Sequence, residues 1–363
     1  MNSDMIHSMS RPAIAHIHLD HLRHNYRLLK SRCGNATMMA VIKANAYGHK
    51  MSLVAPALLE EGCTSFAVTD AAEGHELRSI LGRPNHIEIA LLSGIFDEED
   101  AELTHRHALT PVISELRQIK LLQGAGFQGH AWIKIDTGMN RLDAENTDQI
   151  LESCHQAEIK VRGLMSHLAC ADEPGHPMNR QQTERFNKRC DQIAPELPRS
   201  LLNSAGLIIM PEYAGDVVRP GIALYGAEPV ADHPIGLKPV MTLTGEIMQV
   251  RDIAAGVSIS YGASFTAKQA MRIAVVGLGY ADGVPRGLSN RGQVFLNGCK
   301  QAIVGRVCMD YTMIDVTDTD AKPGDTVEFW GENILANDVA KLLDTISYTL
   351  LTGVGERVRR KAV

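Results

Sequence analysis

The sequence lacks several features that would indicate particular classes of protein. Its seven cysteines are odd in number and include no Cys-x-x-Cys pair, which is typical of free thiols in a reducing compartment. No apolar run is long enough to span a bilayer, and Met1–Arg11 has no apolar segment like that of a signal peptide. The net charge of -6 argues against nucleic-acid binding and against a role at the membrane surface. We therefore expect a cytoplasmic protein.

What is present suits a protein of two domains. A chain of 363 residues is long enough for one large domain and a smaller one. Short apolar runs alternate with helical stretches as far as Gly236, after which short β segments predominate. We expect a first domain over residues 1–237 and a second over 238–363, with a strand near 12–19 packing with the second.

Eight short apolar segments of the first domain have the length and composition of buried strands. They are residues 39–43, 65–68, 87–92, 109–112, 131–135, 161–167, 200–203 and 217–219, and helical stretches include 71–81, 113–122, 147–157 and 180–193. Asp20 is expected to cap an earlier helix that ends near Arg32. Eight such units predict an α/β fold with a (β/α)8 TIM-type barrel, although a doubly wound sheet of about six strands gives a similar alternation.

The second domain is expected to be mostly β. Its predicted strands lie at residues 241–250, 272–276, 293–296, 301–307, 313–316 and 326–330, with one short helix at 336–343.

The apolar segment Met38–Ile42 ends at Lys43, and small and turn-forming residues follow at once. The carboxyl end of a parallel strand is the edge at which α/β folds build their sites. Burial lowers the pKa of a lysine, and a neutral amine attacks a carbonyl carbon to form a Schiff base. From the residues alone, Lys43 is either such a reactive amine or a lysine that ends a strand and reaches water.

Three further polar residues stand at predicted strand ends or beside small residues. The planar guanidinium of Arg141 could hold a substrate carboxylate through two hydrogen bonds, or it could pair with a surface acid. His167 ends a strand, where a histidine is ordinarily a hydrogen-bonded polar residue. Tyr261 lies between small residues, where a tyrosine is ordinarily a packing residue.

Small residues follow the seventh and eighth predicted strands, in Asn203–Gly206 and Pro220–Ile222. Free backbone N–H groups at these positions of a barrel can bind a phosphate, although Ser-Ala-Gly occurs in many turns. The four histidines between residues 16 and 24 lack the cysteines or carboxylates that would complete a metal site, so no metal is expected.

Segments along nearly the whole chain resemble the ordered motifs of the alanine racemases. Val41–His49 is similar to the segment that carries the pyridoxal-phosphate lysine of that family. The other similar segments are Trp132–Arg141, Leu164–Asp172, Asn203–Gly206, Val218–Ile222, Ser260–Phe265, Gly279–Arg286, Gly305–Asp310 and Ile346–Leu351. The ending Arg357–Val363 departs from the family's pattern, and we expect this to affect the packing of the terminus and not the chemistry.

The resemblance implies that pyridoxal 5′-phosphate is bound and that Lys43 holds it covalently. The implied cofactor-binding residues are Lys43, Tyr47, Ser204, Arg219, Gly221, Ile222 and Tyr348. Arg219 would meet the pyridine nitrogen, and because arginine does not give up its proton, that nitrogen should stay unprotonated. The cofactor would then be a weaker electron sink, which discourages transamination.

Further roles follow from the resemblance. Arg141 and the backbone N–H of Met309 would bind the substrate carboxylate, and His167 would join the hydrogen-bond network of the catalytic tyrosine. Lys134, if carbamylated, would hold Arg141 in place. The residues that would line the route of substrate access are Asp172, Tyr280, Arg286 and Arg306.

The implied reaction is the interconversion of L-alanine and D-alanine in a homodimer with shared sites. Lys43 and Tyr261 of the partner subunit would be the two bases, one on each face of Cα. A decarboxylase of the same fold is one alternative, but its usual arrangement of a catalytic cysteine and aspartate in the β domain is missing, and Cys308 stands at a variable position. A carrier of the cofactor without turnover is another, but such proteins resemble the barrel alone. The sequence leaves open whether D-alanine is supplied for peptidoglycan or degraded, and whether serine is accepted.

Overall fold

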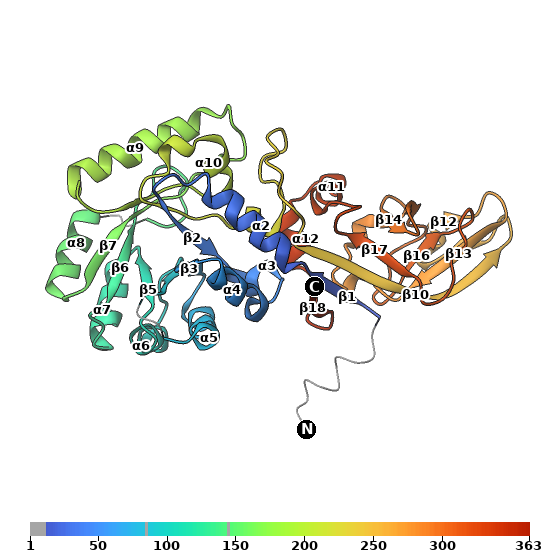
Figure 1. Cartoon of the computed structure of the whole chain (residues 1–363), viewed down its shortest axis with the longest axis horizontal. Coiled ribbons are helices and arrows are strands. Elements are labelled where there is room, and N and C mark those ends of the chain that lie inside the picture. The colour runs from blue at the N-terminus through green and yellow to red at the C-terminus, as the bar shows by residue number, and fades with distance from the viewer. Residues whose placement is uncertain (1–11, 84–85, 144–145) are drawn as a thin grey trace, which may run out of the picture. The chain divides into compact units, whose positions relative to one another are not determined.

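The computed structural model describes residues 12–83, 86–143 and 146–363, which divide into two compact units. The barrel unit comprises the described residues within 22–46 and 50–237, and the β unit comprises residues 12–21, 47–49 and 238–363. Both are drawn in Figure 1. Among the described residues, no helix is both long enough and apolar enough to cross a membrane.

The barrel unit contains a sheet of eight parallel strands. They are β2 (Thr37–Val41), β3 (Ser65–Val68), β4 (Glu88–Leu91), β5 (Thr110–Ile113), β6 (His130–Lys134), β7 (Lys160–Met165), β8 (Arg199–Ser200) and β9 (Val217–Val218). Neighbouring strands pair in the order β8-β7-β6-β5-β4-β3-β2-β9, and a parallel bridge between Asn203 and Arg219 joins the two ends. The predicted (β/α)8 barrel is therefore confirmed, and the open-sheet alternative is wrong.

Helices lie on the outside of these strands (Figure 1). They are α2 (Leu19–Lys30), α4 (Met51–Glu60), α5 (Ala71–Leu81), α6 (Glu98–Arg106), α7 (Leu116–Gly124), α8 (Thr147–Gln156), α9 (Pro177–Ile193) and α10 (Ser204–Ile209), with 3-10 turns η1 (Pro211–Tyr213) and η2 (Ile222–Tyr225). The strand side chains are almost wholly buried, both those that face the helices and those that face the barrel interior, and Phe66 and Trp132 are examples. This burial on both faces explains why the strands are continuous apolar runs.

Three helix starts differ from the prediction. α9 begins at Pro177 and not at residue 180, because proline is tolerated in the first turn of a helix. α2 begins at Leu19, so Asp20 lies in its first turn and is not its N-cap. There the carboxylate still lies near the positive end of the helix dipole. The helix expected from residue 113 begins at Leu116, because Ile113 completes β5.

The β unit has a mixed sheet of eight strands. They are β1 (Ile14–Ile17), β10 (Met241–Ile253), β13 (Met271–Val276), β14 (Gln293–Leu296), β15 (Cys299–Ala302), β16 (Thr312–Asp315), β17 (Thr326–Trp330) and β18 (Arg359–Ala362), and a separate hairpin joins β11 (Ser258–Ile259) to β12 (Phe265–Thr266). The first strand of the chain, β1, pairs with β10 and β18.

Two expectations for this unit were wrong. Two short helices occur where one was expected, α11 (Ala336–Leu342) and α12 (Ser347–Thr352). The strand expected over residues 301–307 is shorter: β15 ends at Ala302, and Ile303 then forms an isolated bridge with Ile314. The apolar residues that follow β15 pack as core instead, as Val304 does.

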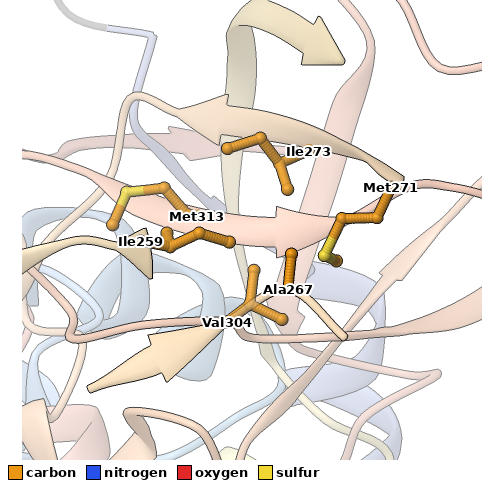
Figure 2. Close-up of a cluster of buried hydrophobic side chains, with 6 residues drawn as sticks. All are labelled: Ile259, Ala267, Met271, Ile273, Val304 and Met313. Carbon is orange, nitrogen blue, oxygen red and sulfur yellow. The ribbon is translucent and has the colours of Figure 1, made fainter. Parts of the chain in front are cut away.

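One buried cluster of the β unit includes a residue close in sequence to Tyr261, a predicted catalytic residue. Figure 2 shows its six side chains, Ile259, Ala267, Met271, Ile273, Val304 and Met313. Each is at most 9% exposed. Ile259 is only two residues before Tyr261, so the cluster anchors the segment that carries this tyrosine.

Candidate active site

Lys43 follows β2 and begins an unusual turn, α3 (Lys43–Tyr47). Four successive residues without a glycine among them, Ala44 to Tyr47, have φ angles of 51–56°. A left-handed conformation costs roughly 1–2 kcal/mol for each such residue, and it persists only where the surroundings enforce it. A loop leading into a helix was expected here, and the turn was missed because Ala-Asn-Ala-Tyr contains no glycine to signal it.

Glu73, on α5, is the main support of this turn within the barrel unit. Its Oε1 accepts a hydrogen bond from the N–H of Ala44 at 2.6 Å, and its Oε2 accepts one from the N–H of Thr69 at 2.8 Å. The side-chain oxygen of Asn45 accepts from the N–H of Met51 at 2.7 Å, which fixes the far end of the turn. Bonds to a charged carboxylate are stronger than neutral ones, so Glu73 offsets part of the backbone strain.

We expect Glu73→Gln to destabilise the protein and to weaken cofactor retention. A neutral amide replaces the charged acceptor, and one of its two ends becomes a donor that faces a backbone N–H. The expected loss is about 1–3 kcal/mol in the free energy of unfolding, measured by denaturant titration. Glu76→Gln, on the exposed face of the same helix, is the matched control. Equal stability of the two variants would show that Glu73 does not support the turn.

The side chain of Lys43 is partly buried, and its amine has no hydrogen bond or ion pair within the described chain. Burial lowers the pKa of this amine, and the positive charge of Arg141 lowers it further, while Glu73 acts in the opposite direction. A lysine with a depressed pKa and no partner is available to react with a carbonyl group.

Arg219 lies just beyond β9 and is only 4% exposed. Its guanidinium donates to the carbonyl oxygens of Ser166 and Leu201 at 2.6 and 3.3 Å, to the hydroxyl of Ser200, and to Nδ1 of His167 at 3.3 Å. Within the described residues it has no carboxylate partner. The arginine is thus a buried cation held in one orientation by oxygen and nitrogen acceptors.

His167 is neutral in this arrangement. Burial, and then the charges of Arg219 and Lys134, lower its pKa well below the ordinary value. Because an arginine can only donate, Nδ1 of His167 is the acceptor and the ring proton lies on Nε2. Gln182, on α9, fixes this segment by donating to the carbonyl oxygen of His167 at 3.0 Å and accepting from the N–H of Ala169 at 2.8 Å.

Lys134 is the last residue of β6 and is only 8% exposed. Burial, Arg219 and Arg141 together lower the pKa of its amine to about 7, against the opposing charges of Asp136 and Asp143. A large fraction of this amine is therefore neutral at physiological pH. The neutral form is the one that can react with carbon dioxide.

The depressed pKa of Lys134 predicts a pH-dependent cost to stability. Below pH 7 the folded protein must bury a charged amine, whereas the unfolded amine stays protonated up to its ordinary pKa of 10.5. The stability contribution of Lys134 therefore rises as pH increases from 7 towards 10.5. We expect Lys134→Met to melt above the wild type at about pH 6 in buffer free of carbon dioxide, with the difference shrinking by about pH 9. A difference that does not vary with pH would show that Lys134 is not buried as a charged group.

Arg141 is exposed and lies beyond β6, in a segment shaped by Asp136. The carboxylate of Asp136 accepts from the N–H groups of Gly138 and Arg141 at 2.5 and 3.3 Å. The charge of Arg141 lowers the pKa values of Lys43, Lys134 and His167. Arg141 also lines a cavity of about 810 Å³, but none of those three residues lines it. Arg141 is thus placed to meet an anionic substrate group.

Ser204 begins α10 on the same edge of the barrel and organises the segment after β9. Its Oγ accepts from the N–H groups of Gly221 and Ala223 at 2.8 and 3.3 Å. Ile222 is buried, and its N–H has no acceptor in the part of the chain that the structure describes. A free N–H beside a buried arginine is suited to an anion.

The donor set fits pyridoxal phosphate. Lys43 supplies the amine that a pyridoxal aldehyde needs, and Arg219 supplies a fixed cation. Lys134 and Arg141 are two further cations: burial and the charges of Arg219 and Arg141 lower the pKa of the Lys134 amine, and burial and the charge of Arg141 lower the pKa of Arg219. A phosphate and a substrate carboxylate would neutralise this concentration of positive charge.

Tyr261 begins a 3-10 turn of the β unit, η3 (Tyr261–Ala263), and is 71% exposed. The turn favours glycine at residue 262, because φ is 70° there, and the guanidinium of Arg306 lies against this glycine. The hydroxyl of Ser260 donates to the carbonyl oxygen of Arg306 at 2.7 Å. Tyr261 and Arg306 therefore lie on segments that are tied together.

Met309 and Tyr280 also lie on neighbouring segments of the β unit. The N–H groups of Tyr280 and Ala281 donate to the carbonyl oxygens of Cys308 and Met309, at 2.9 and 3.0 Å. The N–H of Met309 itself has no acceptor among the described residues.

The C-terminal arginines contact these segments, although the ending was expected to matter only for packing. Arg357 donates to Asp282 and Asp310, each at 2.7 Å. Arg360 donates to the carbonyl oxygen of Gly48 at 3.0 Å, next to Tyr47. The terminus therefore supports residues of the candidate site.

The ring of Tyr47 packs near that of Tyr348, with centroids 5.9 Å apart. Both tyrosines belong to the β unit.

The structure thus groups the predicted residues by unit. The barrel unit brings together Lys43, Lys134, Arg141, His167, Ser204, Arg219, Gly221 and Ile222, with Asp172 exposed in the turn after His167. The β unit holds Tyr47, Tyr261, Tyr280, Arg286, Arg306, Met309 and Tyr348, of which Arg286 is exposed at the start of η5 (Arg286–Leu288). Within the described residues, no three histidine, cysteine, aspartate or glutamate side chains form a group suited to a metal ion.

Several supporting residues were missed from the sequence. Glu73 is three residues after the N-cap Asp70, a spacing that predicts a helix start but not the bond to Ala44. Ser166, Ser200 and Gln182 act through contacts distant in sequence, which no local pattern signals.

Comparison with known proteins identifies the family. Residues 17–229 match the N-terminal domain of alanine racemase, and residues 240–362 match its C-terminal domain. The alanine racemase of Aromatoleum aromaticum is 41% identical over 356 residues, which cover 96% of this chain and 98% of that protein.

Two solved structures share the fold over 97% of this chain and 99% of their own, each with a TM-score of 0.89. One is the biosynthetic alanine racemase from Pseudomonas aeruginosa, at 36% identity. The other is the alanine racemase from Bartonella henselae with covalently bound pyridoxal phosphate, at 35% identity. The resemblance found in the motifs is confirmed, and this chain belongs to the alanine racemase family of isomerases.

Proposed function

We propose that this protein interconverts L-alanine and D-alanine with pyridoxal phosphate held by Lys43. The observation that carries the proposal is the partly buried, unpartnered amine of Lys43 at a strand end, among cations suited to a phosphate and a carboxylate. The solved relative with covalently bound pyridoxal phosphate supports the same assignment. We propose that the D-alanine is supplied for peptidoglycan, because one solved relative is named as a biosynthetic alanine racemase.

The residues divide the work as follows. Arg141 would bind the substrate carboxylate, and the free N–H of Met309 would be a second donor to it. Ser204, Gly221 and Ile222 would lie at the phosphate. Tyr47 and Tyr348 would contact the cofactor. The substrate would pass Asp172, Tyr280, Arg286 and Arg306.

Pyridoxal phosphate, when bound, supplies an electron sink that makes the α-proton of the amino acid acidic. The Nζ atom of Lys43 would remove or return that proton on one face of Cα. The phenolic oxygen of Tyr261 would do so on the opposite face, which is why inversion needs both groups. Arg219 would keep a fixed positive charge and N–H donors at the pyridine nitrogen, so that nitrogen would remain an acceptor.

We also infer that the working unit is a homodimer in which Tyr261 of the partner subunit completes the site of Lys43. Tyr261 is 71% exposed on the single chain, although its backbone is anchored by the buried cluster next to it. A large exposed aromatic on a rigid support suits an interface with another subunit.

Lys134 would be carbamylated in this site. Its amine, with a pKa of about 7, is the right nucleophile, and the new negative charge would lie among Arg141 and Arg219. That charge would hold Arg141 in position for the substrate.

The proposed activity is tested with purified protein loaded with pyridoxal phosphate. L-Alanine and L-serine are supplied separately, and formation of each D-isomer is followed by chiral chromatography. Conversion of L-alanine to an equal mixture of isomers, with no release of carbon dioxide, is expected. Release of carbon dioxide would indicate a decarboxylase, and binding of the cofactor without turnover would indicate a carrier.

A further inference from the structure

A second large cavity lies at the opposite edge of the barrel from Lys43. It has a volume of about 920 Å³ and is lined by residues at the amino ends of the strands, among them Thr37, Glu88, Thr110 and His130. Lys43 and Lys134 instead follow or end their strands at the carboxyl edge. A cavity of this size is in the range that holds small organic ligands.

The charge of the lining is strongly positive. Four arginines line the cavity, Arg78, Arg83, Arg106 and Arg162, whereas Glu88 is the single carboxylate among the described lining residues. This contrasts with the net charge of -6 for the whole chain. A concentration of one sign of charge in a concave site attracts ligands of the opposite sign.

Arg78 is the buried arginine of this cavity, and its guanidinium is fixed in place by hydrogen bonds. Although it is only 5% exposed, its guanidinium donates to three backbone carbonyl oxygens and to no carboxylate in the described chain. The acceptors are His107, Ile87 and Ala108, at 3.1, 3.1 and 3.3 Å. Burying a positive charge without a negative partner costs folding free energy, and Arg78 is buried in this way. An anion in the cavity would remove that cost.

The other cations line the same cavity. His107 lines the cavity too: burial lowers the pKa of its ring, and the charges of His75, Arg83, Arg106 and Arg78 lower it further. The rings of His75 and His107 lie 4.2 Å apart.

Arg162 is oriented by its neighbours. Its guanidinium carbon lies 5.9 Å from the centre of the Trp132 ring, and its Nε lies 3.9 Å from a carboxylate oxygen of Glu88. Glu88 also accepts from the indole N–H of Trp132 at 2.9 Å and from the hydroxyl of Ser65 at 3.1 Å. With these bonds, Glu88 offsets part of the charge of Arg162. Arg78 has no carboxylate partner in the described chain, and Arg106 pairs only with the exposed Glu102, at 3.7 Å.

We propose that this cavity, lined by Arg78, Arg83, Arg106 and Arg162 at the amino edge of the barrel, binds a small anion with two or more phosphate or carboxylate groups. A multivalent anion fits because the guanidinium groups of Arg83, Arg106 and Arg162 come from separate segments and can each donate to an anionic group, while the bonded Arg78 contributes a fixed positive charge. Threonine and serine hydroxyls on the strand ends would supply further donors. This site is separate from the proposed racemase site and does not depend on it.

The test is isothermal titration of the holoenzyme with inorganic pyrophosphate and with citrate, at constant ionic strength set by chloride. Saturating alanine is included in a second series, because an anion at the amino edge should bind equally well with the substrate present. We expect one saturable site for at least one of the two anions. Preference between pyrophosphate and citrate distinguishes a phosphate ligand from a carboxylate ligand.

Matched variants locate the site. Arg106→Gln and Arg180→Gln both remove an exposed helical arginine that pairs with a glutamate four residues away, but only Arg106 lines the cavity. We expect Arg106→Gln to weaken binding roughly threefold to tenfold, within the 1.4 kcal/mol that one tenfold step represents, and Arg180→Gln to leave it unchanged. Glu88→Gln should strengthen binding, because it removes the one opposing charge.

Three results would overturn the proposal. The first is no saturation below about 10 mM for either anion, an affinity too weak for a built site. The second is an equal loss of anion affinity in Arg106→Gln and Arg180→Gln, which would show that only the net charge of the protein matters. The third is loss of anion binding when alanine is added, which would place the anion at the racemase site.

Discussion

Lys43→Ala is expected to abolish racemisation and the visible absorption of the lysine-bound cofactor together. Both depend on the same amine: it is the predicted covalent attachment and one of the two predicted bases. Loss of a general base alone costs about 10²–10⁴ in rate, and loss of attachment adds to this. The measurements are the absorption spectrum and the rate of D-alanine formation from L-alanine.

Lys120→Ala is a suitable control for this substitution. Lys120 is exposed on α7, so its removal should leave the spectrum and the rate unchanged. A Lys43→Ala protein that remained yellow and racemised alanine in both directions would refute the assignment of Lys43.

Complementation between two inactive variants is the second large effect that we expect. Lys43→Ala and Tyr261→Phe should each be nearly inactive as homodimers. If each site takes Lys43 from one subunit and Tyr261 from the other, a mixed dimer has one site with both lesions and one with neither. By two-fold symmetry it should recover about half of the wild-type activity, with an unchanged KM for alanine.

The mixed dimer is obtained by co-expression with two different tags and purification over both. Mixing separately purified, non-exchanging homodimers is the control and should give no recovery. Purified mixed dimers that stay inactive would show that the tyrosine acts in the site of its own chain.

Much of the barrel could be predicted because its signals are local. A short apolar run predicts a strand at residues 65–68, and helical periodicity predicts a helix at 71–81. The structure has β3 and α5 at the same residues. The position of Lys43 at the end of an apolar run likewise gives its place at the carboxyl edge of the barrel.

What was missed depends on contacts distant in sequence. The left-handed turn after Lys43 contains two alanines and a tyrosine, which disfavour that conformation, and it forms beside a carboxylate from Glu73. Arg357 and Arg360 lie in an ending that looked unrelated to the site, yet their donors reach Asp310 and Gly48. No periodicity or motif encodes such a bond, because it is created only when the chain folds.

The lowered pKa of Lys134 could not be predicted from the sequence either. Lys134 could be placed at the end of a strand, but the fall in its pKa to about 7 depends on burial and on the nearness of Arg219 and Arg141. These residues are far apart in the chain and meet only because parallel strands bring their carboxyl ends to one edge.

The central claim is that two bases, Lys43 and Tyr261, act on opposite faces of Cα. The most direct test is to incubate Tyr261→Phe, loaded with cofactor, in deuterium oxide with L-alanine and with D-alanine separately, and to follow deuterium at Cα by mass spectrometry alongside chirality. Lys43 alone should still exchange the α-proton of one enantiomer without inverting it, while inversion falls by about 10²-fold or more. Inversion at the wild-type rate, or equal exchange from both enantiomers, would contradict the two-base account.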